Sequence, residues 1–464
     1  MKSVFASRRY PLLALLFCLV MMQFFLADRA VALTGEVHMH DPSTVVRCDG
    51  RYYVFSTGRG IPIFSSNDGW TWERSGKVFD QVPESVHAVV PLNKDALVWA
   101  PDIIHHNGEY YLYYSISSWG SNVSAVGLMT NPTLNQKDAR YRWTDRGLVV
   151  NSVKGENLNA IDPGVMEAPD HTLWLTYGSY IGNVQLVQLD AKTGLRIAKN
   201  SPTHILSSES EASDLIYHDG FYYLFINRGS CCRKKDSTYN IRMGRSKTVT
   251  GPYLDPWGED MAHGGGALFL SSHGHLIGPG HFGLLAEDSV EKFSSHYEAD
   301  LDNGGTSVLD IQPLLWNQDG WPAAGSDPVD GTYQIRSRGT GQIIETSVAD
   351  GQQSAHVMQG RYIVLDTQQW QISRAGQYYK LLSKDGKQAL QAVTASELVL
   401  EARPASEDVS QLWQIDQTTD GSYRIESAVN KLALTAATGG TNPTRLDLKK
   451  YTGDDAQKWI LAVP

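Results

Sequence analysis

Aromatic-rich runs of alternating residues recur along the first part of the chain, and a polar turn precedes each of them. Asp-Gly or Asn-Gly pairs start the clearest runs, and these residues tolerate the positive φ angles of hairpin turns. Alternation and an abundance of Tyr, Phe and Leu favour β-strands. Helical patterns of any length are nearly absent after Leu33. The five runs cover residues 49–55, 107–113, 170–175, 219–225 and 272–277.

The spacing of these runs predicts the architecture. The turn residues Gly50 and Gly108 are 58 residues apart, and Gly220 and Gly274 are 54 residues apart. Each interval suits one four-stranded unit, so the five units favour a five-bladed β-propeller over residues 33–325. A β-sandwich built from similar hairpins is the alternative.

A second repeat follows a Pro- and Gly-rich linker near residues 321–328. Three Gln-x-Trp triplets end at Trp370, Trp413 and Trp459, which are 43 and 46 residues apart, and a short strand-like run opens each unit. Three such units resemble the ricin-type β-trefoil. The resemblance implies a β-trefoil over residues 326–464, which would serve as a carbohydrate-binding module. The predicted fold is therefore all-β, with a five-bladed β-propeller followed by a β-trefoil.

Residues 1–32 have the pattern of a secretory signal peptide. Basic residues precede an apolar run over residues 10–26, and a small-residue segment ends at Ala32. We expect cleavage after Ala32 and a secreted protein, extracellular or periplasmic, that is a monomer and is not inserted in a membrane. A retained signal anchor is the alternative, because the apolar run approaches the length of a short membrane-spanning helix.

Charge and cysteine content exclude several classes of protein. The 464 residues carry a formal net charge of −10 with both signs interleaved, which makes nucleic acid an unsuitable partner. The chain has 12 Trp and 22 Tyr; most are expected to fill a β-rich core, and some suit stacking on sugars. Beyond the signal, Cys48, Cys231 and Cys232 form neither a disulfide framework nor a zinc motif, and their redox state stays open.

Two Asp-Pro pairs and one glutamate precede the aromatic runs of different units. Asp41 and Asp162 each stand directly before a proline, and Glu211 lies just ahead of the fourth run. An Asp before Pro is common in turns, so each pair by itself suits a structural role. Because the construction recurs at matching positions, we expect these carboxylates to converge on a central channel.

Together these segments resemble the arabinanases of glycoside hydrolase family forty-three over roughly residues 37–322. That resemblance implies a five-bladed propeller and an inverting hydrolase that cleaves α-1,5-L-arabinofuranosidic bonds within arabinan or arabino-oligosaccharides. The alternatives are an exo-acting α-L-arabinofuranosidase or β-xylosidase, a non-catalytic carbohydrate-binding protein, and a propeller scaffold for protein interactions. The matching segments cover residues 40–43, 99–102, 113–117, 120–122, 159–163, 211–212, 231–232, 237–241, 251–253 and 278–281.

The resemblance assigns catalytic roles to the three carboxylates. Asp41 would activate water as general base, Glu211 would protonate the leaving oxygen, and Asp162 would orient this acid and raise its pKa. An inverting site needs its acid and base about 6.5–9.5 Å apart. Glu209 competes with Glu211, since strand alternation would put both on one face, but the following Ala212 favours Glu211.

Further binding residues are carried over from the matched segments. The predicted substrate-binding residues are Trp99, Asp102, Trp119, Asn159 and His281, with a capped core aromatic as the alternative for Trp119. The resemblance also makes His281 a metal ligand, for calcium with waters, although calcium prefers oxygen ligands.

The trefoil resemblance gives a weaker expectation of sugar binding. In sugar-binding members an Asp follows a Leu after the opening strand of each repeat. The matching positions are Glu345, Gln391 and Thr435, and only the first keeps a carboxylate. The Gln-x-Trp triplets are expected mainly to build the core.

Overall fold

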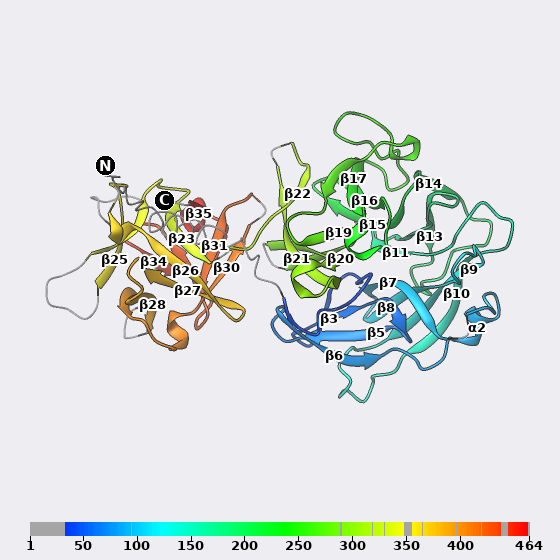
Figure 1. Cartoon of the computed structure of the whole chain (residues 1–464), viewed down its shortest axis with the longest axis horizontal. Coiled ribbons are helices and arrows are strands. Elements are labelled where there is room, and N and C mark those ends of the chain that lie inside the picture. Colours follow the sequence, from blue (N-terminus) through cyan, green and yellow to red (C-terminus); the bar gives the residue numbers. More distant parts are fainter. Residues whose placement is uncertain are drawn as a thin grey trace, which may run out of the picture.

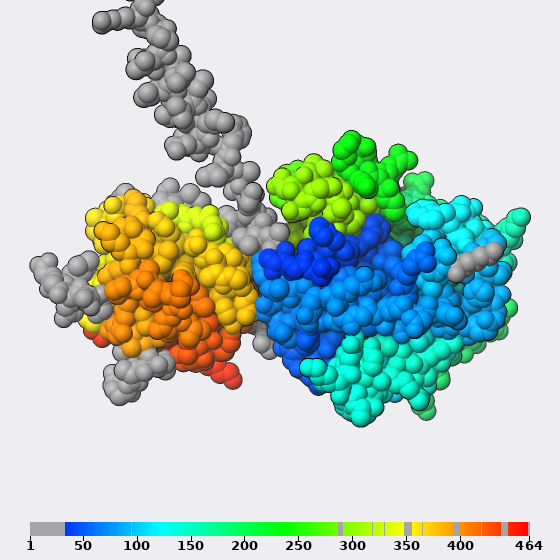
Figure 2. Space-filling model, turned by 60° about the horizontal axis from the view of Figure 1, so that its bottom comes forward, coloured from blue at the N-terminus to red at the C-terminus, as the bar shows by residue number. Residues whose placement is uncertain are grey.

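A computed structural model describes residues 33–462, except 94, 288–289, 318, 329, 348–354, 364, 395–397, 419 and 438–443. The predicted signal peptide, residues 1–32, lies outside the described residues. Nearly all regular structure is β-strand, and the chain forms two lobes that lie side by side (Figures 1 and 2). None of the described helices has the length and apolar character needed to cross a membrane.

Five sheets form the first lobe. Blade one contains β1 (Thr34–Gly35), β2 (Val46–Cys48), β3 (Arg51–Phe55), β5 (Pro62–Ser66) and β6 (Thr71–Lys77). Blade two contains β4 (Gly58–Arg59), β7 (Leu97–His106), β8 (Glu109–Ile116), β9 (Ser124–Asn131) and β10 (Thr144–Ser152). Blade three contains β11 (Gly164–Glu167), β12 (Leu173–Tyr177), β13 (Val184–Leu189) and β14 (Thr203–Ser207).

The remaining two blades complete the ring. Blade four contains β15 (Glu211–His218), β16 (Phe221–Arg228), β17 (Asn240–Ser246) and β18 (Ala267–Leu270). Blade five contains β19 (Leu276–Glu287), β20 (Val290–Asp300), β21 (Thr306–Trp316) and β22 (Pro322–Ala324). Short helices α2 (Glu84–His87), η1 (Lys234–Asp236), η2 (Met261–His263) and η3 (Leu301–Asn303) lie between strands. The five-bladed propeller is confirmed, and the sandwich alternative is wrong.

The turn chemistry that predicted the strands is visible in the backbone. Asn107 and Gly108 adopt positive φ angles of 51° and 79° in the turn between β7 and β8. Four aromatic runs form the second strands β3, β8, β12 and β16 of their blades. The fifth run differs, because residues 272–277 cover a turn and the start of β19, the first strand of blade five.

The first strands of successive blades contact one another from blade one to blade five, so they surround the centre of the propeller. They are β2, β7, β11, β15 and β19. The ring closes where the Leu309 amide of β21 donates a 2.8 Å hydrogen bond to the Val37 carbonyl, which precedes β2. This closure joins the last blade to the start of the first.

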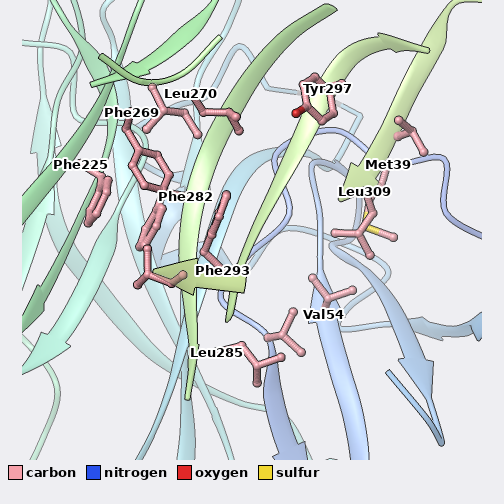
Figure 3. Close-up of a cluster of buried hydrophobic side chains, with 14 of the residues drawn as sticks. Met39, Val54, Phe225, Phe269, Leu270, Phe282, Leu285, Phe293, Tyr297 and Leu309 are labelled. Carbon is pink, nitrogen blue, oxygen red and sulfur yellow. The ribbon is translucent and has the colours of Figure 1, made fainter. Parts of the chain in front are cut away.

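Apolar side chains fill the space between adjacent blades. Figure 3 shows Phe225 of blade four beside Phe282 of blade five, and their rings stack with centroids 3.7 Å apart. Phe269 and Phe293 pack edge-on nearby at 5.0 Å. Rigid aromatic packing of this kind fixes the blades relative to each other, and with them the residues that each blade brings to the centre.

The second lobe is the β-trefoil. Its strands are β23 (Gly331–Ser337), β24 (Ile343–Ser347), β25 (Ala355–Gly360), β26 (Trp370–Ala375), β27 (Tyr378–Ser383), β28 (Gln388–Thr394), β29 (Leu398–Pro404), β30 (Trp413–Gln417), β31 (Tyr423–Ser427), β32 (Ala433–Thr435), β33 (Thr444–Arg445), β34 (Asp447–Lys449) and β35 (Trp459–Ala462). The 3₁₀ turns η4 (Asp366–Gln368), η5 (Val409–Gln411) and η6 (Asp455–Gln457) precede the three tryptophans. Equivalent turns at equivalent places confirm the threefold repeat.

The triplet tryptophans are buried core residues, as predicted. The indoles of Trp370, Trp413 and Trp459 donate hydrogen bonds of 3.0, 2.9 and 3.0 Å to backbone carbonyls. The triplet glutamines donate to the three predicted sugar positions: Gln368 to Glu345 at 2.8 Å, Gln411 to Gln391 at 2.9 Å, and Gln457 to Thr435 at 3.2 Å. The sequence therefore identified equivalent positions in the three repeats.

Polar and aromatic contacts join the two lobes. Lys292 of β20 lies 3.3 Å from the buried Asp416 of β30. The guanidinium of Arg374, on β26, lies 3.6 Å from the centre of the Trp70 ring in blade one. Such desolvated contacts favour one fixed arrangement of the lobes.

Candidate active site

One pocket collects a residue from every blade of the propeller. Asp41 precedes β2, Trp99 lies on β7, Asp162 precedes β11, Glu211 begins β15, and His281 lies on β19. The pocket is lined by His40, Asp41, Thr57, Trp99, Trp119, Ile161, Asp162, Glu211, Cys231, Cys232, Tyr239 and His281. The structure thus brings together all three predicted catalytic carboxylates, both predicted tryptophans and His281.

Left-handed backbone conformations place these side chains. Asp41, Asp162 and His281 have φ angles of 49°, 55° and 54°. Ala100 and Ala212, which follow Trp99 and Glu211 directly, have φ angles of 40° and 50°. Such angles are uncommon outside glycine and cost about 1 kcal/mol or more each. Their recurrence at one place in every blade marks the pocket as a region where the fold maintains strain.

Asp41 is held as a carboxylate. Its Oδ2 accepts a 2.6 Å hydrogen bond from the Thr57 hydroxyl and lies 2.8 Å from His40 Nδ1, while Oδ1 lies 3.0 Å from His281 Nδ1. Burial alone would raise the pKa of Asp41, but the charges of His40 and His281 hold it well below its usual range. An ionised carboxylate in a pocket is able to accept a proton from water.

Glu211 has the opposite character. Burial raises its pKa to about 7, and the nearby Asp41 charge adds to this, against the hydrogen bond from Tyr239 and the charge of His281. Burial and the neighbouring Glu211 charge also raise the pKa of Asp162 well above its usual range. The Glu211–Asp162 pair therefore retains a proton near neutral pH, because two buried like charges disfavour each other.

The structure separates the two competing glutamates. Glu209 is exposed and lies outside the pocket, whereas Glu211 is part of its lining. The expectation that both share a face was wrong: Glu209 sits before β15 in a left-handed turn with φ 51°, and Ala212 interrupts the alternation after Glu211.

Trp99 and Trp119 form an aromatic wall of the pocket. Their ring centroids lie 5.2 Å apart with a tilt of 51°, and Trp119 is 75% exposed in the loop between β8 and β9. A capped core position for Trp119 is therefore wrong. The exposed indole of Trp119, beside the partly buried Trp99, presents a flat apolar face to a ligand.

Asp102 and Asn159 lie outside the pocket lining. Their side chains form hydrogen bonds with other groups of the protein. Asp102 accepts hydrogen bonds from the backbone amides of Thr44 (3.0 Å) and Val165 (2.9 Å), so it ties blade two to blades one and three. The Asn159 side chain bonds to two buried serine hydroxyls, those of Ser124 and Ser179. Both positions support the blades around the pocket.

Several pocket residues were missed from the sequence. Thr57 and Tyr239 bond directly to Asp41 and Glu211, respectively. Tyr239 lies within a segment that resembles arabinanases, which offered a signal for it, whereas Thr57 lies outside every matched segment. Cys231 and Cys232 also line the pocket; their sulfur atoms are 3.0 Å apart and are not joined in a disulfide.

The calcium site expected at His281 would depend mostly on water ligands. Among the described residues, the clusters with three donor atoms within 4.8 Å are His40–Asp41–His296 and His40–Cys232–Glu298. Neither includes His281, and nitrogen or sulfur supplies two of the three donors in each. Ca²⁺ takes about six to eight oxygen ligands, so water would supply most of them beside His281, and the steps derived below use only the side chains of the protein.

Comparison with known proteins agrees with the geometry of the pocket. The model of glycosyl hydrolases family 43 matches residues 34–322, and that of the ricin-type beta-trefoil lectin domain-like family matches residues 366–449. The extracellular exo-alpha-(1->5)-L-arabinofuranosidase of Cellvibrio japonicus is 39% identical over 64% of this chain and 88% of its own. The extracellular endo-alpha-(1->5)-L-arabinanase 1 of Bacillus subtilis is 36% identical over 61% of this chain and 87% of its own.

Solved structures agree as well. The alpha-L-arabinanase of Cellvibrio cellulosa, in complex with arabinohexaose, aligns with a TM-score of 0.60 at 36% identity. The alignment covers 62% of this chain and 96% of that one. The family model, which matches residues 34–322, takes in every blade that contributes to the pocket. The chain therefore belongs to glycosyl hydrolases family 43.

Proposed function

We propose that the protein is a secreted arabinan hydrolase that cleaves α-1,5-L-arabinofuranosidic bonds within the polymer. The observation that carries this proposal is the opposite protonation of two carboxylates in one pocket. The charges of His40 and His281 favour ionised Asp41, whereas burial favours protonated Glu211. Glycoside hydrolysis requires such a pair, since the leaving oxygen needs a proton while water needs a base.

The reaction follows from these charge states. Asp41 takes a proton from a water molecule as that water attacks the anomeric carbon. Glu211 gives its proton to the glycosidic oxygen as the bond to the leaving sugar breaks. Because water attacks from the face opposite the leaving group, a single displacement inverts the anomeric centre. Asp162 assists Glu211 by making its ionisation less favourable and by accepting a 3.3 Å hydrogen bond from the Ala212 amide.

The substrate assignment rests on the relatives and on the aromatic wall of the pocket. The two relatives described above are named for α-1,5-linked arabinofuranosyl substrates, and both are named extracellular. Trp99 and Trp119 provide faces on which a furanose ring would stack. The names of the relatives and the signal-like residues 1–32 both support secretion.

Exo action is the second candidate, because the exo-named relative is 39% identical and the endo-named relative 36%. Debranched linear arabinan distinguishes the two. An endo enzyme lowers the viscosity and chain length early, whereas an exo enzyme releases monomer or short oligomer steadily while the chain length falls slowly. A parallel assay on arabinoxylan tests the β-xylosidase alternative.

Asp41→Asn tests the catalytic proposal. An amide cannot accept the proton of water, so we expect a loss of turnover of about 10²–10⁴-fold with folding and oligosaccharide binding retained. Wild-type-like release of reducing ends by this variant contradicts the base assignment. If the wild-type protein binds arabinan but releases no reducing ends, the non-catalytic carbohydrate-binding alternative is correct.

A further inference from the structure

His40 lies between two carboxylates that are far apart in the sequence. Its Nδ1 is 2.8 Å from Asp41 Oδ2, and its Nε2 is 3.2 Å from Glu298 Oε1. Glu298 belongs to β20, the second strand of blade five, and its side chain is buried behind the pocket lining. One imidazole thus connects the proposed base to a carboxylate that does not itself line the pocket.

A second histidine, His296, lies between Asp41 and the Glu298 carboxylate. The Asp41 amide donates a 3.3 Å hydrogen bond to His296 Nδ1, so that nitrogen is an acceptor and the ring proton of His296 is on Nε2. His296 Nε2 lies 3.7 Å from Glu298 Oε1. Burial and the His40 charge lower the pKa of His296, which agrees with a neutral ring. Glu298 therefore faces two imidazoles that both contact Asp41.

The charges in this group are mutually consistent. Burial disfavours a charged His40, but the charge of Asp41 and hydrogen bonds with Asp41, Cys232 and Glu298 raise its pKa well above the usual value. Burial likewise disfavours ionised Glu298, yet its contacts with His296 and His40 lower its pKa to about 2. His40 is accordingly an imidazolium that donates one N–H to each carboxylate.

Loss of the Glu298 charge would release His40 from this state. A neutral imidazole carries only one proton, so it can donate to Asp41 or to the side chain at position 298 but not to both. In one tautomer, Nδ1 would present a lone pair to Asp41 Oδ2. That contact is repulsive and would turn the carboxylate away from the direction in which Thr57 and His40 now hold it.

We propose that Glu298 is a positioning residue for hydrolysis, which acts through His40 to hold the Asp41 carboxylate correctly oriented toward water. This inference rests on the proposed function, in which Asp41 is the general base. It assigns a role to a buried glutamate that does not itself line the pocket.

The first test substitutes Glu298 while retaining its shape. In Glu298→Gln the amide oxygen still fits beside His40, but the charge is lost. We expect kcat on linear arabinan to fall about 10- to 100-fold, which is part of the roughly 10²–10⁴-fold that a general base contributes. KM should stay within about twofold, because no substrate contact changes.

Glu167→Gln is the matched control. Glu167 also contacts a buried histidine, with its Oε2 at 2.8 Å from His106 Nδ1, but it lies on β11 outside the pocket lining. This variant should keep the wild-type kcat. Melting temperatures of both variants measure how much stability each loses with its carboxylate–histidine contact. A loss of kcat in Glu298→Gln alone, at similar melting temperatures, is then not an effect of folding.

Two further readouts separate a role through Asp41 from a structural role. On an aryl α-L-arabinofuranoside with an activated leaving group, Glu298→Gln should lose the same factor in kcat as on arabinan, since water activation is still required. In an Asp41→Asn background, Glu298→Gln should cause no further loss, because effects that act through one group are not additive.

A conservative variant guards against misfolding. Glu298→Asp keeps the charge on a shorter side chain, so its kcat should lie between those of wild type and Glu298→Gln. An active wild type with kcat unchanged in Glu298→Gln overturns the inference, as does an additive loss in the Asp41→Asn background or failure of both Glu298 variants to fold. A wild type without activity on arabinan instead contradicts the proposed function itself.

Discussion

The phenol of Tyr239 donates a 3.0 Å hydrogen bond to Glu211 Oε1, and both residues line the pocket. Tyr239 is itself buried, and burial raises the pKa of its hydroxyl well above the usual value, so it stays a donor. The bond stabilises the carboxylate form of Glu211 and opposes the burial that raises the glutamate pKa to about 7. Tyr239 thereby limits how far the proposed acid is shifted.

Tyr239→Phe should move the alkaline limb of the pH profile upward. An acid works while protonated, so kcat/KM should fall as pH rises through the Glu211 pKa of about 7. Removing the hydrogen bond destabilises the carboxylate, and a bond worth about 1 kcal/mol corresponds to roughly 0.7 pH unit. Profiles of kcat/KM against pH for both proteins check this, and a limb that moves downward or stays fixed contradicts it.

Glu211→Ala and Glu209→Ala should give opposite results. Glu211→Ala should lose about 10²–10⁴-fold in kcat on arabinan, but far less on an aryl arabinofuranoside, whose leaving group needs little protonation. Glu209 is exposed and outside the pocket, so Glu209→Ala should keep activity on both substrates. Steady-state kinetics with the two substrates measures this, and the reverse pattern would make Glu209 the acid.

Trp119→Ala should weaken substrate binding more than turnover. The indole is 75% exposed beside Trp99, and loss of a stacking contact worth about 1 kcal/mol corresponds to a KM roughly fivefold higher. Trp257→Ala is the control, because Trp257 is 76% exposed and lies outside the pocket lining. Steady-state kinetics on arabino-oligosaccharides measures the KM of both variants. An equal change in KM for the two would contradict the stacking role of Trp119.

Asp416→Asn should destabilise the protein at neutral pH. Burial opposes ionisation of Asp416, but the charges of Lys292 and Arg424 lower its pKa below the usual value. Breaking a buried pair costs about 3 kcal/mol. Because the pKa is lower in the folded state, this stabilisation is present above the unfolded pKa near 3.8 and is lost as pH falls through the folded pKa.

Melting temperatures of wild type and Asp416→Asn at pH 7 and at about pH 3 check this dependence. The difference should be large at pH 7 and smaller at the acid pH. Asp447→Asn is the control, since Asp447 pairs with Lys449 on the surface, where such pairs contribute little. Equal melting temperatures of Asp416→Asn and wild type at pH 7 would show that the pair does not stabilise the contact between the lobes.

Local sequence was sufficient for the fold class and, together with the resemblance to arabinanases, for the three carboxylates. Turn pairs such as Asn107-Gly108 dictate hairpins through their own backbone preferences, so the blades follow from short-range chemistry. Asp41, Asp162 and Glu211 each stand ahead of, or at the start of, the first strand of a blade, and the resemblance to arabinanases gave them their roles. Because the turn and strand pattern repeats in each blade, it can be recognised in the sequence without knowledge of distant contacts.

Tertiary structure alone decided which neighbours act on those carboxylates. Glu298 and His40 are 258 residues apart and meet only because blade five closes against blade one. Alternation in the sequence gives Glu209 and Glu211 the same predicted face. In the structure Glu209 lies in a left-handed turn before β15, so only Glu211 reaches the pocket. The sequence by itself determined the chemical groups and the blade from which each comes. Their protonation and orientation depend on burial and on charges across the ring, which exist only once the propeller has closed.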